Sequence, residues 1–414
     1  MGSVNSLYRG GLILLVGFIF FKMGGFLFKI ICMNVMPVSA YGEVAVFMVL
    51  FNWFVLFATF NVTIGLAKFI SHDKGKKELY YTASLAGSLL ITLVVCAALL
   101  VLAPWMSGVL NVGYPVILWA IASVPFAVIY NIGIFYFRGL YRMKSSTYAD
   151  IMMTVIRIAA LIGFFLAGIV YAPYIAFLLS FMAIDFYLLL KSRVRTRFER
   201  SEVFHAFREL LIYSVPVFLS EFLRLFSTDV DRLMLSGFYS SFEAGVYDVA
   251  VSLCLGYIII ANSYSNALLP LASSSQHDGS KRRGELRRAL KASTAFFILY
   301  TAIVLIAGRP VIGMINPAYM GIFSFLPALI VAYILIGFLT VLTFYANSVG
   351  YQKHAVYAGA VFAFLNLALN FYLIPRMMYW GAIYALTVSC AASLAVMALL
   401  IWKVEMCGRK VKRP

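Results

Sequence analysis

Long apolar runs recur along the whole chain and constrain its fold more than any other feature. Twelve of them approach or exceed the length of about 20 apolar residues that an α-helix needs to cross a bilayer. They lie at 10–32, 41–70, 79–103, 113–137, 148–170, 172–190, 209–236, 243–269, 290–315, 321–348, 355–374 and 380–403. Only 12% of the 414 residues are charged and 63% are hydrophobic, which leaves too little polar surface for a soluble protein. We therefore predict an all-α integral membrane protein, and the composition excludes soluble enzymes, nucleic-acid-binding proteins and disordered chains.

Lysine and arginine are distributed unevenly among the segments that join these spans. If the N-terminus is cytoplasmic, 25 of the 33 basic residues lie on the inside, 2 lie outside and 6 lie within spans. An excess of basic residues on the cytoplasmic side is the usual signal of membrane topology. A missed span would reverse the pattern after it, so the bias favours twelve spans in the plasma or inner membrane with both termini cytoplasmic. This flanking role also explains the net charge of +17 without a nucleic-acid partner.

The longest polar stretch divides the chain into two sets of six spans. The predicted parts are an N-terminal six-helix bundle at 1–190, a basic connector at 191–208, a C-terminal six-helix bundle at 209–403 and a basic tail at 404–414. At the end of the connector, Phe204, Phe207 and Leu211 follow helical spacing with charges between them. This pattern is compatible with an amphipathic helix on the inner membrane surface or with a solvated link. The basic segment at 281–291 is a second candidate for such an element.

The two halves show a weak internal repeat. An alignment of Gly42 with Gly245 places similar short segments side by side and pairs Lys29 of the first span with Arg232 of the seventh. Transporters are often built from two related halves around a central site. Chance could produce any single match, but several together indicate a duplicated six-helix unit in parallel orientation.

Two lysines lie within the first span, where an ionisable group is costly. Lys22 and Lys29 are seven residues apart, about two helical turns, so they share a face with Gly25 between them. The span has no acidic residue to neutralise them. One interpretation is that the lysines reach toward the membrane interface, which suits Lys29 better. The other is that Lys22 faces a water-filled cavity.

The seventh span is the most polar of the twelve. On a helical wheel one stripe holds five polar residues, and Asp229 lies to one side of it. The stripe consists of Glu221, Arg224, Thr228, Asp231 and Arg232. Internal pairs three residues apart, Glu221 with Arg224 and Thr228 with Asp231, are one explanation, because they would let the helix insert. The alternative is a polar wall of a transport pathway with a carboxylate that binds H⁺ or Na⁺.

Other polar residues within spans are isolated in the sequence. We expect Arg157 and Asp185 to pair across adjacent helices as a structural clamp, whereas Asp248 has no evident partner. Asn366 and Asn370 lie one turn apart, and hydrogen bonds between helices are their expected role.

Catalytic and cofactor motifs are absent from the sequence. It contains no P-loop, no dinucleotide-binding glycine motif, no zinc-protease motif and no nucleophile elbow. The five cysteines and four histidines are scattered, which argues against a metal site. We therefore expect a transporter rather than an enzyme, with no cofactor beyond a coupling ion, H⁺ or Na⁺.

Four stretches in a fixed order carry a family resemblance. They are Pro37–Gly42 after the first span, Phe137–Lys144 after the fourth, Asp229–Leu235 followed by Glu243–Tyr247, and Asn366–Pro375 leading into Tyr379–Ala382. With them the chain resembles the polysaccharide-export flippases (O-antigen translocase type) of the multidrug/oligosaccharidyl-lipid/polysaccharide exporter superfamily. The resemblance extends over essentially the whole chain.

The resemblance implies a fold and a function. The fold is two pseudo-symmetric six-helix bundles arranged as a V around a central cavity that spans one and seven line. The function is to move a polyprenyl-phosphate-linked oligosaccharide to the outer leaflet by alternating access. Lys22 and Arg224 best match the basic residues that hold phosphate, and Lys29 and Arg232 are further candidates. Candidates for ion or proton coupling are Glu221, Asp231, Asp229 and Asp185, and candidates for polar cavity lining are Thr228, Asn366 and Asn370.

Partners follow from the same resemblance. We expect a monomer that meets lipid-linked oligosaccharide, membrane lipids and polysaccharide-assembly proteins. The alternative function is an ion-coupled multidrug or cation antiporter of the same superfamily, which the carboxylates of the sixth and seventh spans leave open. Lys22 and Lys29 argue against it, because a cationic drug prefers an acidic cavity. A different twelve-span carrier and a membrane-bound transferase fit less well, the latter because the outside loops are short.

Overall fold

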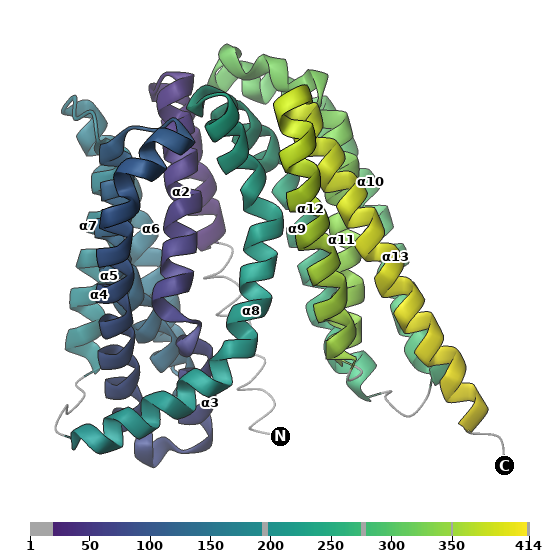
Figure 1. Cartoon of the computed structure of the whole chain (residues 1–414), viewed down its shortest axis with the longest axis horizontal. Helices are drawn as coiled ribbons and strands as arrows, with labels where there is room; N and C mark the ends of the chain where they lie inside the picture. The colour runs from purple at the N-terminus through teal and green to yellow at the C-terminus, as the bar shows by residue number, and fades with distance from the viewer. Residues whose placement is uncertain (1–19, 193–197, 275–278, 349–350, 412–414) are drawn as a thin grey trace. The chain divides into compact units, whose positions relative to one another are not determined.

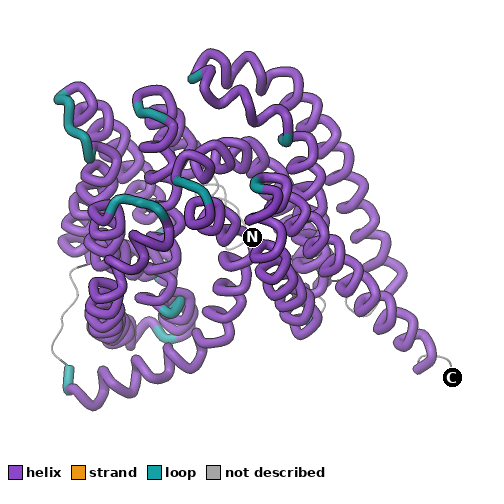
Figure 2. Tube along the Cα trace, turned by 45° about the horizontal axis from the view of Figure 1, so that its top comes forward, coloured by secondary structure: helices purple, strands orange, loops and turns teal. Residues whose placement is uncertain are grey.

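The computed structural model describes residues 20–192, 198–274, 279–348 and 351–411, and every long element in them is a helix. Figure 2 shows these helices joined by short loops, with no strand in the described part of the chain. Eleven of the helices are long and apolar enough to cross a membrane. They confirm the third to twelfth predicted spans and the part of the second that lies before residue 60. The first predicted span begins outside the described residues, and its described part belongs to a helix at 20–35.

The first half of the chain continues with α2 (Val38–Thr59), α3 (Val62–His72), α4 (Lys77–Leu110), α5 (Tyr114–Gly139), α6 (Met143–Leu166) and α7 (Ala172–Ser192). The second half holds α8 (Arg200–Phe238), α9 (Ser241–Ser274), α10 (Gly279–Ile315), α11 (Leu326–Ser348), α12 (Gln352–Met377) and α13 (Tyr379–Val411). Short 3₁₀ helices precede α4 at Lys74–Lys76 and α11 at Pro317–Ser324.

The second predicted span is wrong as a single helix. Phe60 and Asn61 adopt left-handed backbone angles, with φ of 45° and 53°, and separate α2 from α3. A left-handed residue with a side chain costs about 1–2 kcal/mol, so the surrounding contacts must hold this break in place. The ring of Phe218 in α8 stacks on Phe60 with centroids 4.5 Å apart and supplies one such contact.

The chain forms two compact units, Met1–Phe222 and Leu223–Pro414, so the division falls inside α8. Figure 1 shows this helix as one long teal ribbon, and it contains Pro216. Unit 1 therefore includes the first part of α8, which the sequence predicts as the end of the connector, to 208, and the start of the C-terminal bundle, from 209.

Aromatic side chains form the centre of unit 1 between α2 and α7. The rings of Phe47 and Phe51 meet the ring of Phe177 edge to face, with centroids 5.3 and 4.8 Å apart. The ring of Phe181 lies 5.3 Å from that of Phe177 in the same geometry. Such pairs add about 0.5–1.5 kcal/mol each beyond the burial of their surface.

The amphipathic segment predicted near 198–211 is helical from Arg200 onward and packs on unit 1. A Cβ at Gly87 of α4 would come within 2.3 Å of the Phe207 ring, so the two helices approach closely there. The Tyr80 hydroxyl of α4 donates to Glu209 over 3.2 Å. The segment is thus the first part of a long helix rather than a solvated link, and the second candidate, at 281–291, likewise forms the start of α10.

Close backbone contact between α12 and α13 characterises unit 2. A Cβ at Gly381 would lie 2.4 Å from the Leu373 carbonyl oxygen, so only glycine fits at this position. Further along, the Ser393 hydroxyl of α13 donates to the Ala358 carbonyl of α12 over 2.7 Å. These contacts hold α12, which carries Asn366 and Asn370, in a fixed position.

Candidate functional site

A buried cluster of charges in unit 2 joins α8 to α9. The guanidinium of Arg232 donates to Asp229 over 2.6 Å and to Asp248 of α9 over 2.9 Å. It also donates to the Thr228 carbonyl oxygen over 3.2 Å. The Asp248 side chain is fully buried, and only 12% of the Arg232 side chain is exposed. Charge-assisted bonds of this kind are about twice as strong as neutral ones, so they fix the two helices against each other.

The neighbouring carboxylate, Asp231, points to α9 and α12 instead. It accepts hydrogen bonds from the Tyr247 hydroxyl over 3.2 Å and from the Asn370 amide nitrogen over 2.6 Å. Asn370 also donates to the Asn366 amide oxygen over 2.9 Å. Asp231 is 2% exposed, and both asparagines are fully buried. The expected hydrogen bond between helices is confirmed for Asn370, whereas Asn366 accepts from Asn370 on its own helix.

The composition of this cluster suits it to bind a proton or a cation. It contains three carboxylates, those of Asp229, Asp231 and Asp248, and a single guanidinium. Buried charges without compensation are expensive, so a proton or a cation near Asp231 would stabilise the cluster. The Asn366 amide nitrogen and the Asn370 amide oxygen are buried without a hydrogen-bond partner. An unpartnered amide oxygen beside a carboxylate is the kind of ligand that a hard cation takes.

The structure differs from the sequence-based view at two residues of the seventh span and at one residue of the eighth. The Thr228 hydroxyl donates to the Arg224 carbonyl over 3.0 Å, so the predicted pair with Asp231 does not form within the described residues. Asp229, placed aside from the polar stripe, is an ion-pair partner of Arg232. Asp248, which had no evident partner, is the other. Arg232 is therefore committed to two carboxylates, which opposes its assignment as a phosphate-binding residue.

The contact between Arg232 and Asp248 could have been predicted from the spacing of the two residues in the sequence. The two residues lie eight positions before and eight positions after Ser240. Ser240 is in the short turn between α8 and α9. Antiparallel neighbours at equal distances from a turn lie at the same depth, so this spacing predicts contact.

In unit 1 the predicted clamp between Arg157 and Asp185 is wrong. Arg157 donates from Nε to the Ser180 hydroxyl over 3.1 Å, and its guanidinium lies 4.1 Å from the centre of the Phe177 ring. Both Asp185 carboxylate oxygens are buried without a hydrogen-bond partner. A cation above an aromatic face is stabilised by the ring quadrupole, which replaces a carboxylate as the partner of this buried arginine.

A second polar group in unit 1 was missed. The Tyr130 hydroxyl donates to Asp150, and Arg138 lies 3.4 Å from the other oxygen of the same carboxylate. Arg138 lies in the last turn of α5 and Asp150 lies in the second turn of α6. Residues that flank one short turn are neighbours in space, so the sequence carried a usable signal here too.

The remaining phosphate candidates lie on exposed or open surfaces of their units. Lys22 is exposed and Lys29 is half-buried on the helix at 20–35, and Arg224 of α8 is exposed. Gly25 shares the face of the two lysines, and a Cβ at this position would meet no atom within 4 Å. By contrast, a Cβ at the adjacent Gly24 would clash with Thr154. The face that carries the lysines is therefore the open face of this helix within unit 1. Glu221 is half-buried.

Comparisons with known proteins place this arrangement in context. The model of the family described as "Polysaccharide biosynthesis protein" matches residues 7–276. A search of curated proteins finds no match. Among solved structures, the fold is similar to that of the lipid II flippase MurJ in an inward closed conformation, with a TM-score of 0.78 and 16% identity, over 94% of this chain and 87% of the other.

Transporters described as multidrug resistance proteins share the fold as well. An inward-facing MATE family transporter of the MOP superfamily matches with a TM-score of 0.76 and 13% identity, over 93% of this chain and 96% of the other. A MOP superfamily transporter from Pyrococcus furiosus, whose structure is described by the reverse polarity of its binding pocket, matches with a TM-score of 0.62 and 14% identity, over 96% and 95%. These similarities confirm the predicted all-α membrane fold.

Proposed function

Because this chain belongs to the polysaccharide biosynthesis protein family, we propose that it is a flippase for a polyprenyl-phosphate-linked oligosaccharide. The family match over residues 7–276 is the observation that carries the proposal. The fold shared with MurJ, a lipid II flippase, is consistent with it. In this proposal the protein moves the substrate from the cytoplasmic to the outer leaflet of the cell membrane by alternating access between its two bundles.

The physical problem of the reaction is the sugar head group. Its hydroxyl groups would lose their hydrogen bonds in hydrocarbon, so they need a wet and polar path while the lipid tail stays in the bilayer. Lys22 and Arg224, both exposed, supply positive charge for the phosphate. A membrane potential that is negative inside favours outward movement of one negative charge by about 2.3 kcal/mol per 100 mV.

Coupling is assigned to the Asp231 cluster in this proposal. Asp231 and the asparagines of α12 would bind H⁺ or Na⁺, because the cluster holds more carboxylates than cations. Binding an ion there would change the contacts among α8, α9 and α12, which gives the gradient a structural effect. Asp185 in unit 1 is a second candidate, since its carboxylate has no hydrogen-bond partner.

An ion-coupled antiporter of drugs or cations is the second candidate function. The similarity to MATE transporters and the carboxylate-rich cluster in unit 2 favour it. The open face with Lys22 and Lys29 opposes it, because a cationic substrate is repelled by ammonium groups.

Flipping of a fluorescent polyprenyl-diphosphate oligosaccharide in proteoliposomes tests the proposal. The wild-type protein should make the label accessible to an external quencher, whereas Lys22→Ala and Arg224→Ala should slow this transfer at least tenfold. Arg376→Ala removes an exposed cation whose contacts among the described residues are the Tyr372 carbonyl and ring of its own helix, so this control should keep the wild-type rate. Unchanged flipping in both test variants, together with efflux of a cationic dye, would establish the antiporter instead.

A further inference from the structure

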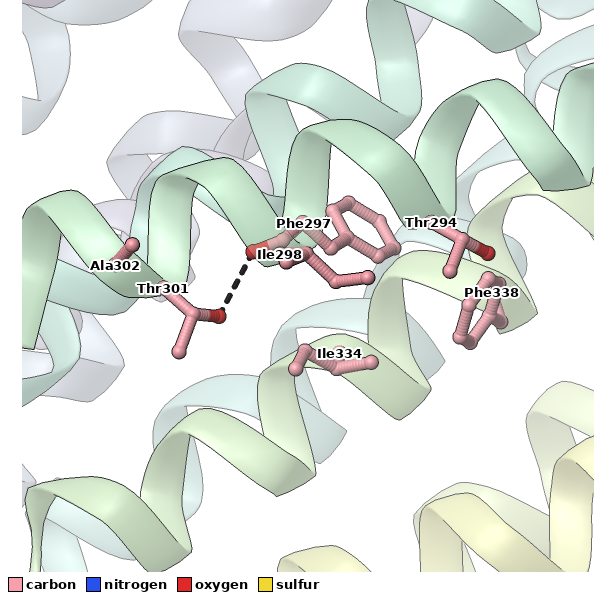
Figure 3. Close-up of a pocket in the computed structure, with 7 residues that line it drawn as sticks. All are labelled: Thr294, Phe297, Ile298, Thr301, Ala302, Ile334 and Phe338. Carbon is pink, nitrogen blue, oxygen red and sulfur yellow. Dashed lines mark hydrogen bonds between the residues drawn. The ribbon is translucent and has the colours of Figure 1, made fainter.

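An apolar groove opens between α10 and α11 in unit 2. It has a volume of about 430 Å³ and is lined by Thr294, Phe297, Ile298 and Thr301 of α10 and by Ile334 and Phe338 of α11. Figure 3 shows these side chains lying between the two helices. Ile298 is 67% exposed, so the groove is open along its length.

The two threonines do not make the groove polar. The Thr294 hydroxyl donates to the Leu290 carbonyl over 2.8 Å, and the Thr301 hydroxyl donates to the Phe297 carbonyl over 2.8 Å (Figure 3). The Thr301 oxygen also lies 2.7 Å from the Tyr257 hydroxyl of α9. Because both hydroxyl protons are donated within unit 2, the threonines offer an occupant no hydrogen-bond donor. The groove therefore suits a hydrocarbon chain.

The floor of the groove is a tight aromatic contact between α10 and α11. The Phe297 ring is 2% exposed and lies so close to Gly337 of α11 that a Cβ there would come within 2.5 Å of it. The rings of Phe297 and Phe338 meet edge to face with centroids 5.3 Å apart. The floor is therefore filled by packed aromatic rings, and an occupant would lie on top of them.

Positive charge stands at one end of the groove. Arg287 lies two turns before Thr294 and about 20° from it around α10, and Lys291 lies about 60° from it. Both side chains are exposed, and no carboxylate of the described residues forms an ion pair with them. The basic pair and the groove thus lie along one strip of α10. The topology predicted from the sequence places this end at the cytoplasmic surface.

We propose that this strip binds a resident anionic phospholipid of the cytoplasmic leaflet, with its phosphate at Arg287 and Lys291 and one acyl chain in the groove. The two basic side chains favour an anionic head group. The groove favours an apolar tail, because its threonine hydroxyls already donate to carbonyl oxygens of α10. The groove volume of about 430 Å³ corresponds to about fourteen groups of about 30 Å³, the volume of one water molecule in the liquid. A methylene group is of similar size, so this volume suits one acyl chain. The inference concerns a lipid that stays bound and does not rest on the proposed transport function.

Native mass spectrometry of the full chain tests the proposal with phosphatidylglycerol, phosphatidylcholine and polyprenyl phosphate as probes. Phosphatidylglycerol should be retained in preference to the other two. The double variant Arg287→Gln/Lys291→Gln should bind it about 30-fold more weakly, at about 1 kcal/mol per basic group and tenfold per 1.4 kcal/mol. Ala302→Trp, which fills the groove, should weaken binding as well.

Matched variants separate the groove from general effects. Ile303→Trp adds the same ring at an exposed position of α10 that does not line the groove, and Arg309→Gln removes a cation near the other end of the helix. Both should retain phosphatidylglycerol as the wild-type protein does. Equal retention of phosphatidylcholine, preferential retention of polyprenyl phosphate, or wild-type binding by Ala302→Trp would each overturn the proposal.

Discussion

Replacing Arg232 by glutamine separates a structural role of this residue from a role in substrate binding. The change removes the guanidinium that forms ion pairs with Asp229 and Asp248. Breaking a buried pair by removing one partner typically costs about 3–5 kcal/mol. The two charge-assisted bonds that are lost, at about 1.5–3 kcal/mol each, lead to a similar figure.

The compensating change distinguishes the two roles. In Arg232→Gln/Asp248→Asn a neutral pair replaces one of the two ion pairs, and such replacements are often neutral for stability, whereas Asp229 keeps its charge. Thermal unfolding in detergent should show a fall of about 10 °C in Tm for the single variant and recovery of about half of it in the double variant. Arg376→Gln serves as the control, because it removes an exposed cation from the same unit.

Transport by the same variants completes the test. If Arg232 acts only through the carboxylates, the double variant should regain stability and flipping together. A double variant that is stable but does not flip substrate would instead show that Arg232 holds phosphate, as the sequence first indicated. Equal Tm losses in the single and double variants would refute the structural argument.

Three further predictions concern single positions. In the wild-type protein, H⁺ or Na⁺ at 100 times its Kd should raise the free energy of unfolding by about 2.7 kcal/mol and so raise the Tm. Asp231→Asn should abolish this rise. Gly381→Ala should lower the free energy of unfolding by about 1–3 kcal/mol, because the new Cβ would meet the Leu373 backbone. Gly359→Ala is the matched control, because a Cβ there has open space, and it should raise the free energy of unfolding by less than about 1 kcal/mol. Arg157→Met should retain the wild-type Tm within a few degrees, because an apolar chain fits the aromatic pocket, and a large loss would indicate a missing partner for the charge.

The helices were predictable because their signal is redundant. A span of about 20 apolar residues and the basic residues that flank it report the same boundary twice, so eleven spans were located from composition and charge alone. The break at Phe60 and Asn61 carries no such signal. Neither residue is glycine or proline, and the left-handed backbone there is stabilised by the Phe218 ring from a helix more than 150 residues later in the chain.

The sequence predicted which residues form the candidate site better than it predicted which of them contact one another. The sequence identified Asp231, Asn366 and Asn370 as polar residues within spans, and the structure brings them together. It did not identify the partners of Arg232 and Arg157, because a helical wheel ranks residues within one helix and says nothing of the facing helix. Arg157 illustrates the limit, since its partners are a hydroxyl group and two aromatic rings that no charge count would select.

The interruption between α2 and α3 has a consequence for how unit 1 assembles. Acyl chains offer no hydrogen bonds, so an irregular stretch of main chain at the end of a membrane span, as here after Val38–Thr59, has to be sheltered by protein or reached by water. The side of the second span that bears Phe60 is therefore obliged to face the Phe218 side of α8, and its rotation about its own axis is set by that need for shelter. A span with such an interruption can pack in one orientation only, whereas an uninterrupted apolar helix could pack in several. The interruption therefore fixes which face of this span lies against its neighbours in unit 1.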